Sequence, residues 1–208
     1  MQLKLNIMKK ILFITILTLA FYNCKAQSQI LDIDKIGWKN IDNAYYKDTN
    51  DILNNFTGTW LYTSGNTSLK IKLVKITQYF NGTFYEDLLI GGYLYIENGI
   101  EKINTLSDAD NPSIGRNASI KGNNIYNNCK YLPVNDCSEG ERNLNLSIKD
   151  VTSNGHIGDL RIFKRIINGK QAFKINIEMN YLLVSPPDGK LPNPTLPWQM
   201  HDIVFIKQ

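Results

Sequence analysis

The stretch Phe56-Thr57-Gly58-Thr59-Trp60 divides the 208-residue chain into two patterns. Residues 27–48 mix isoleucine with charged residues and hold no sustained helical or strand period. After Trp60 the period becomes two, most clearly in 69–73, where leucine and isoleucine alternate with lysine. Such alternation predicts β-strands with one buried face and one face in water. The main fold is therefore expected to begin at this stretch and to be built from strands.

Pairs of asparagine and glycine separate these strand patterns. Asn-Gly is favoured where both central residues of a turn need positive φ, which is the geometry of a two-residue hairpin. Consecutive strands are therefore expected to be antiparallel neighbours. The pairs are Gly65-Asn66, Asn81-Gly82, Asn98-Gly99, Gly122-Asn123, Asn154-Gly155 and Asn168-Gly169.

The patterns and turns together predict an all-β fold, an antiparallel up-and-down meander of about nine strands. An open sheet of this size leaves edges that invite aggregation, so the meander is expected to close into a barrel or flattened barrel. The expected strands are roughly 59–64, 68–79, 83–97 with a bend at Gly91-Gly92, 100–106, 117–127, 142–150, 157–167, 171–184 and 200–207.

The segments around the strands divide the chain into three parts. We expect a signal peptide over residues 1–26, an amino-terminal arm with a short helix over 27–57, and the barrel domain over 58–208. The helix is expected to be capped by Thr49 or Asn50 and to end at Gly58. Residues 185–198 hold five of the seven prolines, which predicts a long surface connection before the last strand.

The leader has the charged, apolar, small-residue order of a secretory signal. Its apolar run from Ile11 to Tyr22 has 12 residues, whereas a membrane-spanning helix needs roughly 20. We therefore expect export to the periplasm or the exterior, cleavage after Ala26 and no transmembrane helix after processing. Lipidation of Cys24 is the alternative, disfavoured by the bulky residues before it.

Removal of the leader changes the charge of the chain. The leader carries four of the 23 basic residues and none of the 19 acidic ones, so the mature chain is formally neutral. A nucleic acid is therefore not an expected partner, because such binding rests on an excess of positive charge.

Cys129 and Cys137 are the two cysteines that follow the leader. An even pair in an exported protein predicts a disulfide, which would fix the excursion from Asn128 to Gly140. No metal is expected, because the two cysteines lack the usual close spacing of zinc ligands and no histidine is near them in sequence. No cofactor is expected either.

Gly58-Thr59-Trp60 at the start of the first long strand resembles the Gly-x-Trp signature of lipocalins and their relatives. The resemblance implies a barrel that holds a small apolar or amphipathic ligand. It also implies that the tryptophan closes one end of the barrel near a late arginine; no arginine follows Arg165 here, and Lys207 is a possible substitute.

A second resemblance covers most of the mature chain. The chain resembles a family of small secreted bacterial proteins of unknown function, which implies a leader and an all-β fold but no activity. The residues that carry it are Phe56 to Trp60, Asp87, Gly91-Gly92-Tyr93-Leu94-Tyr95, Asn98-Gly99 and Pro197-Trp198.

The residues with catalytic chemistry form no recognisable constellation. Glu86 and Asp87 are neighbours on a strand and are expected to point to opposite faces, in solvent or turn roles. His156 follows an Asn-Gly turn and is expected at the surface. We therefore predict no catalytic residues and a protein that is not an enzyme.

Aromatic residues give the better lead to function. Rings on one face of a barrel strand either fill the core or line an apolar cavity. The candidate lining residues are Trp60, Tyr93, Tyr95, Phe173 and Ile175. One hypothesis is an exported, non-enzymatic binding module for a small apolar or amphipathic ligand. The other is a structural or protein-interaction component of the cell envelope that acts through its loops.

Overall fold

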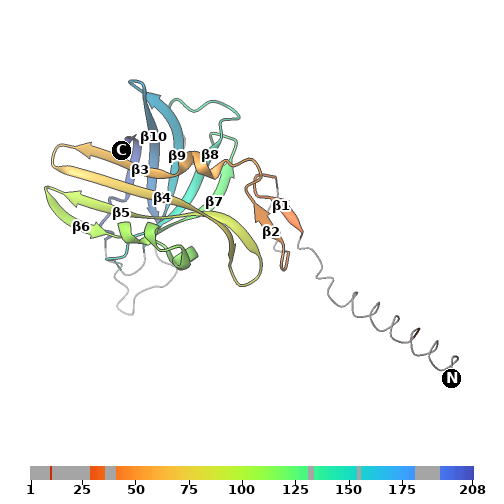
Figure 1. The fold of residues 1–208 in the computed structure, drawn as a ribbon. Coiled ribbons are helices and arrows are strands. Elements are labelled where there is room, and N and C mark those ends of the chain that lie inside the picture. The colour runs from red at the N-terminus through yellow and green to blue at the C-terminus, as the bar shows by residue number, and fades with distance from the viewer. Residues whose placement is uncertain (1–9, 11–28, 36–40, 131–133, 154–155, 181–192) are drawn as a thin grey trace.

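The computed structural model describes residues 10, 29–35, 41–130, 134–153, 156–180 and 193–208. Eight antiparallel strands close into a barrel, and three further strands add to its wall (Figure 1). The predicted all-β barrel is thus confirmed. The strands are β1 (Ile30–Asp32), β2 (Tyr45–Lys47), β3 (Gly58–Ser64), β4 (Thr67–Phe80), β5 (Tyr85–Glu97), β6 (Ile100–Asn104), β7 (Ile120–Tyr126), β8 (Asn143–Lys149), β9 (Ile157–Ile167), β10 (Lys170–Asn180) and β11 (Gln199–Lys207).

Two of the predicted turns have the expected geometry, whereas the predicted turn at Gly122-Asn123 is wrong, because these residues lie inside β7 at a shift in its register with β8. Asn98 and Gly99 have φ of 53° and 78°, and Asn168 and Gly169 have 52° and 75°. Positive φ at both central residues matches the right-handed twist of the flanking strands. These turns join β5 to β6 and β9 to β10 as antiparallel pairs. The signal peptide at 1–26, its cleavage site, the turn at Asn154-Gly155 and residues 181–184 of the predicted eighth strand lie outside the described residues, except for Lys10.

Strand β5 is the branch point of the sheet. One of its edges pairs with β4, while the other pairs in turn with β2, β7 and β6. The prediction that all consecutive strands are neighbours therefore fails between β6 and β7. The chain between them turns back through two 3-10 helices, η2 (Leu106–Asp110) and η3 (Pro112–Asn117). The barrel closes where β11 pairs with β3 through Lys207 and Trp60.

The two glycines in β5 do not interrupt its register with β4. Pairing with β4 continues without a shift from Lys72 opposite Gly92 to Leu73 opposite Gly91. A Cβ atom at Gly92 would lie 1.7 Å from the carbonyl oxygen of Thr105. Gly92 therefore permits the backbone after β6 to lie against the barrel wall.

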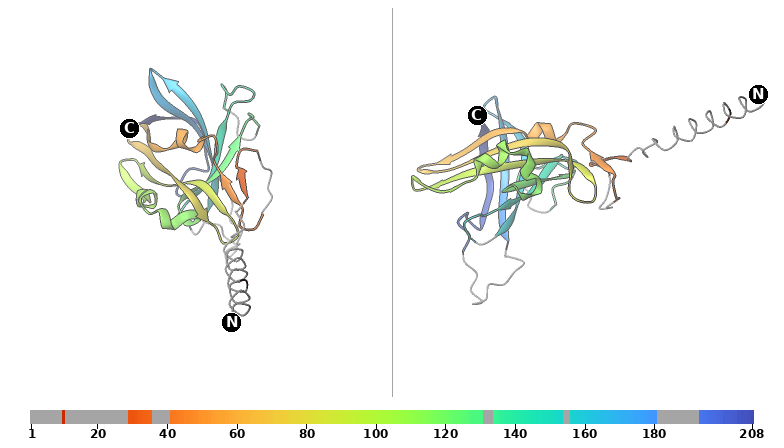
Figure 2. Two further views of the ribbon diagram at one scale, coloured as in Figure 1. Left: turned by 45° about the vertical axis from the view of Figure 1, so that its right-hand side comes forward. Right: turned by 60° about the horizontal axis from the view of Figure 1, so that its bottom comes forward.

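The amino-terminal arm adds two parallel strands of three residues each, β1 and β2, to the side of β5 (Figure 2). A 3-10 helix, η1 (Leu53–Phe56), then leads into β3. The predicted caps Thr49 and Asn50 are wrong, because the Asp48 carboxylate accepts the hydrogen bonds from the Ile52 and Leu53 amides at 2.8 and 2.9 Å. The helix ends at Phe56, and Gly58 is already the first residue of β3.

Side chains fill the barrel interior. Alternate residues of each strand point inward, and eight strands enclose a space that side chains can fill. Trp60, Ile71, Tyr93, Ile162 and Phe173 are each at most 2% exposed and belong to one hydrophobic cluster.

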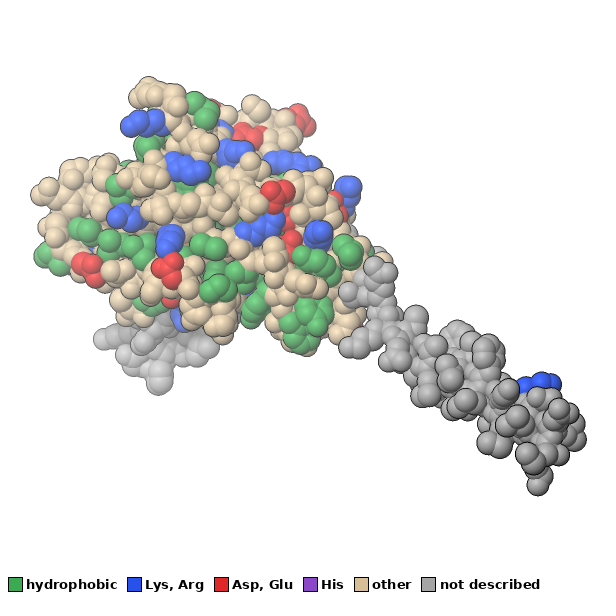
Figure 3. All heavy atoms as spheres, viewed as in Figure 1, with side chains coloured by type: hydrophobic (Ala, Val, Ile, Leu, Met, Phe, Trp, Pro, Cys, Tyr) green, Lys and Arg blue, Asp and Glu red, His purple; other side chains and the backbone are tan. Residues whose placement is uncertain are grey.

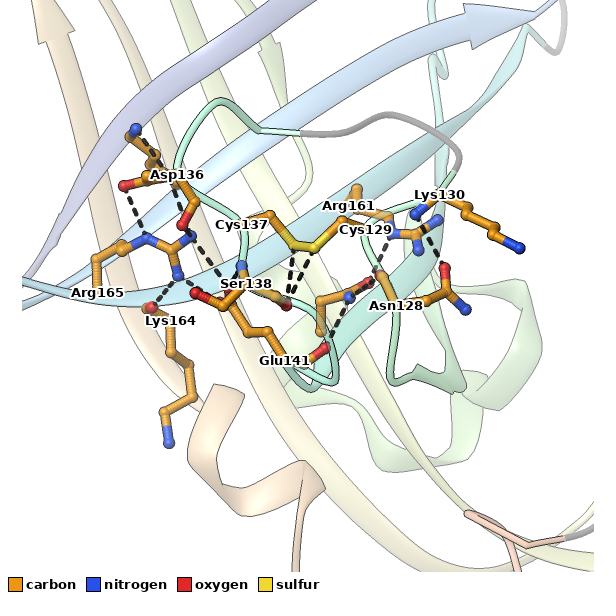
Figure 4. Close-up of a disulfide and its surroundings, with 12 residues drawn as sticks. Asn128, Cys129, Lys130, Asp136, Cys137, Ser138, Glu141, Arg161, Lys164 and Arg165 are labelled. Carbon is orange, nitrogen blue, oxygen red and sulfur yellow. Dashed lines mark hydrogen bonds and ion pairs between the residues drawn. A yellow bond between two sulfur atoms is a disulfide. The ribbon is translucent and has the colours of Figure 1, made fainter.

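The predicted disulfide is present between Cys129 and Cys137. Residues 128–130 and 134–140, here together called the disulfide loop, lie against the outer wall of the barrel (Figure 4). Asn135 donates to Asp202 of β11 at 2.7 Å, and Asp136 forms ion pairs of 3.0 Å with Arg165 and Lys174. The loop is therefore fixed to β9, β10 and β11.

A row of polar side chains lies on the outer face at this place. Strand register puts Asn145, Arg161 and Asn176 opposite one another, and the Asp202 amide donates to Asn176 at 2.7 Å. Arg161 is 2% exposed; its Nε donates to Asn143 and its guanidinium lies 4.3 Å from the Tyr126 ring centre. The row is thus a buried polar seam between the barrel wall and its cover.

Candidate functional site

The five predicted lining residues all lie in the barrel core. Trp60 and Tyr95 are 2% exposed, Phe173 is 1% exposed, and Tyr93 and Ile175 are fully buried. The structure brings Trp60 and Phe173 into a stack with ring centres 3.5 Å apart. The phenol of Tyr93 donates to the Lys149 carbonyl at the opposite end of the barrel, 2.9 Å away. These residues fill the core, and their role toward a ligand stays a prediction.

Lys207, the possible substitute for the late arginine of lipocalins, lies beside Trp60. The Lys207 ammonium lies 5.3 Å from the centre of the Trp60 ring and donates to Gln171 at 2.8 Å. Gly58 has a φ of 118°, and a Cβ atom there would lie 3.3 Å from Cε of Lys207. Glycine at this position therefore accommodates both the left-handed backbone and the lysine stem.

A cavity of about 340 Å³ lies at the end of the barrel where η1 enters, here called the Phe56 end. Phe56 is 2% exposed, and its ring centre lies 5.8 Å from that of Phe173. The apolar floor of the cavity thus continues through Phe173 to Trp60. The lining residues are Ile52, Asn55, Phe56, Glu141, Arg142 and Lys164.

Charged residues form the rim of this cavity. Glu141 pairs with Arg165 and also accepts from the Ser138 amide at 3.2 Å. Arg142 pairs with Asp34 of the arm at 2.7 Å. In the part of the chain that the structure describes, the Lys164 ammonium has no hydrogen-bond or ion-pair partner. At the rim, Glu141 and Arg142 are therefore neutralised by salt bridges, whereas Lys164 is not.

A buried network holds η1 in place at this end. Lys75 pairs with Asp48 and Asp51, both at 2.8 Å. Asp87 accepts hydrogen bonds from the Tyr45 hydroxyl at 2.6 Å and from the Asp48 amide at 3.0 Å. Burial and then the Asp87 hydrogen bond raise the pKa of Tyr45 well above its ordinary value, so Tyr45 remains a donor.

Glu86 and Asp87 were expected in solvent or in turns, and this is wrong, because the two residues are only 1% and 2% exposed. They do face opposite sides of β5: Asp87 bonds the arm, while both carboxylate oxygens of Glu86 accept from Arg116 of η3 at 2.5 Å. Their partners come from segments far apart in the sequence, so the alternation of residues gave no sign of these pairs.

The opposite end, here called the Trp198 end, is built differently. The Asp150 carboxylate accepts from Thr152, Thr195 and Leu196, and thereby binds the segment that precedes β11. His156 is fully buried and packs edge-on against Trp198 with ring centres 5.2 Å apart, which corrects its expected place at the surface.

A second cavity lies beside this segment, with a volume of about 490 Å³. Its wall mixes apolar rings with the charged pair Glu97 and Lys102. Leu196 in its wall is fully buried and belongs to the hydrophobic core, and its amide is held by Asp150. The lining residues are Glu97, Lys102, Asn193, Pro194, Thr195, Leu196, Pro197 and Trp198.

The Phe56-end cavity draws its lining from η1, from residues before β8 and from β9. Sequence reasoning missed this combination because it joins three distant segments. One signal was available: Lys164 continues the inward alternation of Leu160 and Ile162, so it marks the point where this row of β9 leaves the apolar interior.

In the residues that the structure describes, no helix has the length and apolar character needed to span a membrane.

Comparison with known proteins identifies a family but no activity. No curated protein and no solved structure shows a significant match to the chain. The model of a family of unknown function, DUF6705, matches residues 8–208, which is nearly the whole chain. The chain therefore belongs to this family of unknown function.

Proposed function

We propose that the protein is an exported, non-enzymatic binding module that takes a small amphipathic ligand at the Phe56 end of a lipocalin-like barrel. The observation that carries the proposal is the cavity of about 340 Å³ with an apolar floor at Phe56 and a charged rim at Lys164. Ligand sites are typically clefts of about 300–1,000 Å³ with apolar walls and a few polar groups.

The construction of this end supports the proposal. η1 spans only four residues and has a second cavity on its other side, of about 400 Å³, lined in part by Asn54, Gly58 and Lys75. Leu53 and Phe56 anchor η1 in the hydrophobic core, so the cavity beside it has a preformed apolar floor. An apolar tail on Phe56 would lie next to the ring stack of Phe173 and Trp60, two of the predicted lining residues.

The disulfide supports the exported part of the proposal. Disulfides form and persist in oxidising compartments, and the leader has the order of a secretory signal. Cys129 and Cys137 have a bonded geometry with Cα atoms 5.8 Å apart. Cleavage after Ala26 is the expected processing, and mass spectrometry of the protein purified from its own envelope or medium tests it.

Two matched tryptophan variants on η1 test the binding site. Asn55 and Asn54 are both exposed, but Asn55 lines the Phe56-end cavity and Asn54 lines the cavity on the other side of η1. Binding of the neutral fluorescent probe N-phenylnaphthylamine is measured by titration. Asn55→Trp is expected to abolish probe binding, whereas Asn54→Trp leaves it unchanged. The reverse pattern, or no binding by the wild-type protein, overturns the proposal.

An interaction role in the cell envelope is the second candidate. It is favoured by the disulfide loop, which is tied to the outer wall by Asn135 and Asp136 while Lys130 and Glu139 are exposed. Crosslinking in intact cells from a photoreactive residue at Glu139, compared with one at Lys70 on the far wall, tests it. Equal labelling of partners from both positions would remove the loop from consideration.

A further inference from the structure

The Phe56-end cavity has one excess positive charge. Its lining carries one acidic and two basic side chains, and the salt bridges to Asp34 and Arg165 engage Arg142 and Glu141. Arg165 and Lys174 share Asp136 on the outer wall. Lys164 therefore remains as the cation in this group that has no partner in the described chain.

The position of Lys164 fits a head-group contact. It lies directly opposite Phe173 in the pairing of β9 with β10, and Phe173 is a core residue. Lys164 thus belongs to the inward-facing row of β9, at the point where the apolar interior meets water. A lysine stem can cover apolar surface while its ammonium stays solvated.

We infer that the ligand at this end is an anionic amphiphile, whose negative group pairs with Lys164 while its apolar tail lies on Phe56. This inference rests on the proposed function and adds the charge of the ligand to it. A cationic head group is disfavoured because the Glu141 carboxylate is already occupied by Arg165 and by the Ser138 amide. The geometry also assigns a specificity role to Lys164, distinct from the apolar contacts that bind the tail.

Three amphiphiles with the same tail test the inference. Decanoate, decanol and decyltrimethylammonium are titrated into the mature protein by calorimetry, below their micelle concentrations. Decanoate is expected to bind about fivefold more tightly than decanol, the upper limit for a solvent-exposed ion pair. Decyltrimethylammonium is expected to bind more weakly than decanol. The advantage of decanoate should decrease with added salt, because screening weakens exposed charge pairs.

Lys164→Met separates the charge from the stem. This variant keeps an unbranched apolar side chain and is expected to bind decanoate and decanol equally, with the affinity for decanol unchanged. Lys70→Met is the control, since Lys70 lies on β4 and is not among the cavity residues. The control should retain the full preference for decanoate.

The outcomes distinguish the two proposals. If wild-type protein binds decanol and decanoate equally, the anionic head group is wrong and the binding site stands. If none of the three compounds binds, the proposed function and the inference about the head group both fail. If Lys164→Met loses affinity for both compounds equally, Lys164 acts through its stem and the charge inference is overturned.

Discussion

At the Phe56 end the barrel is closed by the rings of Phe56, Phe173 and Trp60, whereas at the Trp198 end a buried carboxylate binds the covering segment. Ring packing is non-directional, so the contacts of Phe56 can be exchanged for those of another apolar group. The hydrogen bonds to Asp150 are directional, and their loss would leave a buried acceptor unsatisfied. The two ends therefore differ in what a ligand must displace.

This difference indicates why the smaller cavity is the better candidate site. The cavity of about 490 Å³ at the Trp198 end lies over residues that Asp150 holds in place. The cavity of about 340 Å³ at the Phe56 end leads toward the core through exchangeable apolar contacts. The kind of contact at each end, ring packing or hydrogen bonds to Asp150, separates the two cavities more than their volumes do.

The largest expected effect is at the Phe56 end. Trp60→Ala should lower the free energy of unfolding by about 3–5 kcal/mol, because it removes a buried ring and leaves a cavity beside Phe173. Denaturant unfolding at neutral pH measures this. Trp60→Phe keeps a ring on Phe173 and should cost clearly less. Equal losses for both variants would contradict the role of the ring stack.

Asp150→Asn tests the Trp198 end by comparison. The amide offers one acceptor oxygen where the carboxylate has two, so the expected loss is about 1–3 kcal/mol at neutral pH. Thr195 and Leu196 amides should then exchange hydrogen faster, while the amides of η1 remain protected. Faster exchange at both ends would mean that the ends are not independent.

The same variant should also differ from the wild type in how its stability depends on pH. Burial opposes ionisation of Asp150, but the hydrogen bonds from Thr152, Leu196 and Thr195 outweigh it and lower its pKa below the ordinary value. The contribution of Asp150 is therefore present above the unfolded value of about 3.9 and is lost as the pH falls through the folded value. Between neutral and acid pH, the free energy of unfolding should therefore change less with pH for Asp150→Asn than for the wild type.

Removal of the disulfide should affect the two ends unequally. The bond closes a loop with a sequence separation of 8, so Cys129→Ser with Cys137→Ser is expected to cost about 2 kcal/mol. The loop continues directly into Glu141 and Arg142 at the rim of the Phe56-end cavity. Hydrogen exchange should therefore increase at the amide of Arg142 and not at that of Leu196. An increase at Leu196 as well would show that the loop supports the whole barrel.

The smallest expected effect is that of Lys207→Met. The variant removes the cation above the Trp60 ring and keeps the stem beside Gly58. A cation–π contact at an exposed position contributes about 0.5–1 kcal/mol. Lys207→Arg should retain this contribution in denaturant unfolding. A loss comparable to that of Trp60→Ala would mean that Lys207 acts mainly through packing.

The sequence predicted the parts of the fold that depend on local pattern. Alternating residues in 69–73 and the Asn-Gly pair at 98–99 determine a strand and a turn without reference to the rest of the chain. β1 and β2 escaped notice because three residues are too few to show a period. The pairing of β7 with β5 could not be predicted, because β2, β6 and β7 compete for the same edge of β5.

The candidate site was predictable only in its floor. Trp60 and Phe173 were expected to face inward, and they meet in a stack. Glu141 and Arg142 follow the disulfide loop in the chain, and no local pattern specifies that they meet η1 and β9 at the cavity. The burial of Asp87 depends likewise on Tyr45, which is 42 positions away in the chain.

The polar seam beneath the disulfide loop favours the correct register of the barrel strands over a shifted one. A slip of one residue between β8 and β9 would turn Arg161 into the apolar interior and turn Leu160 and Ile162 outward. Asn143 would then lose its donor, and the loop would no longer meet Asp202 and Lys174 in the positions that bring the cysteines together. We expect the covalent bond to form mainly in correctly paired chains, so free thiols counted after folding would report register errors.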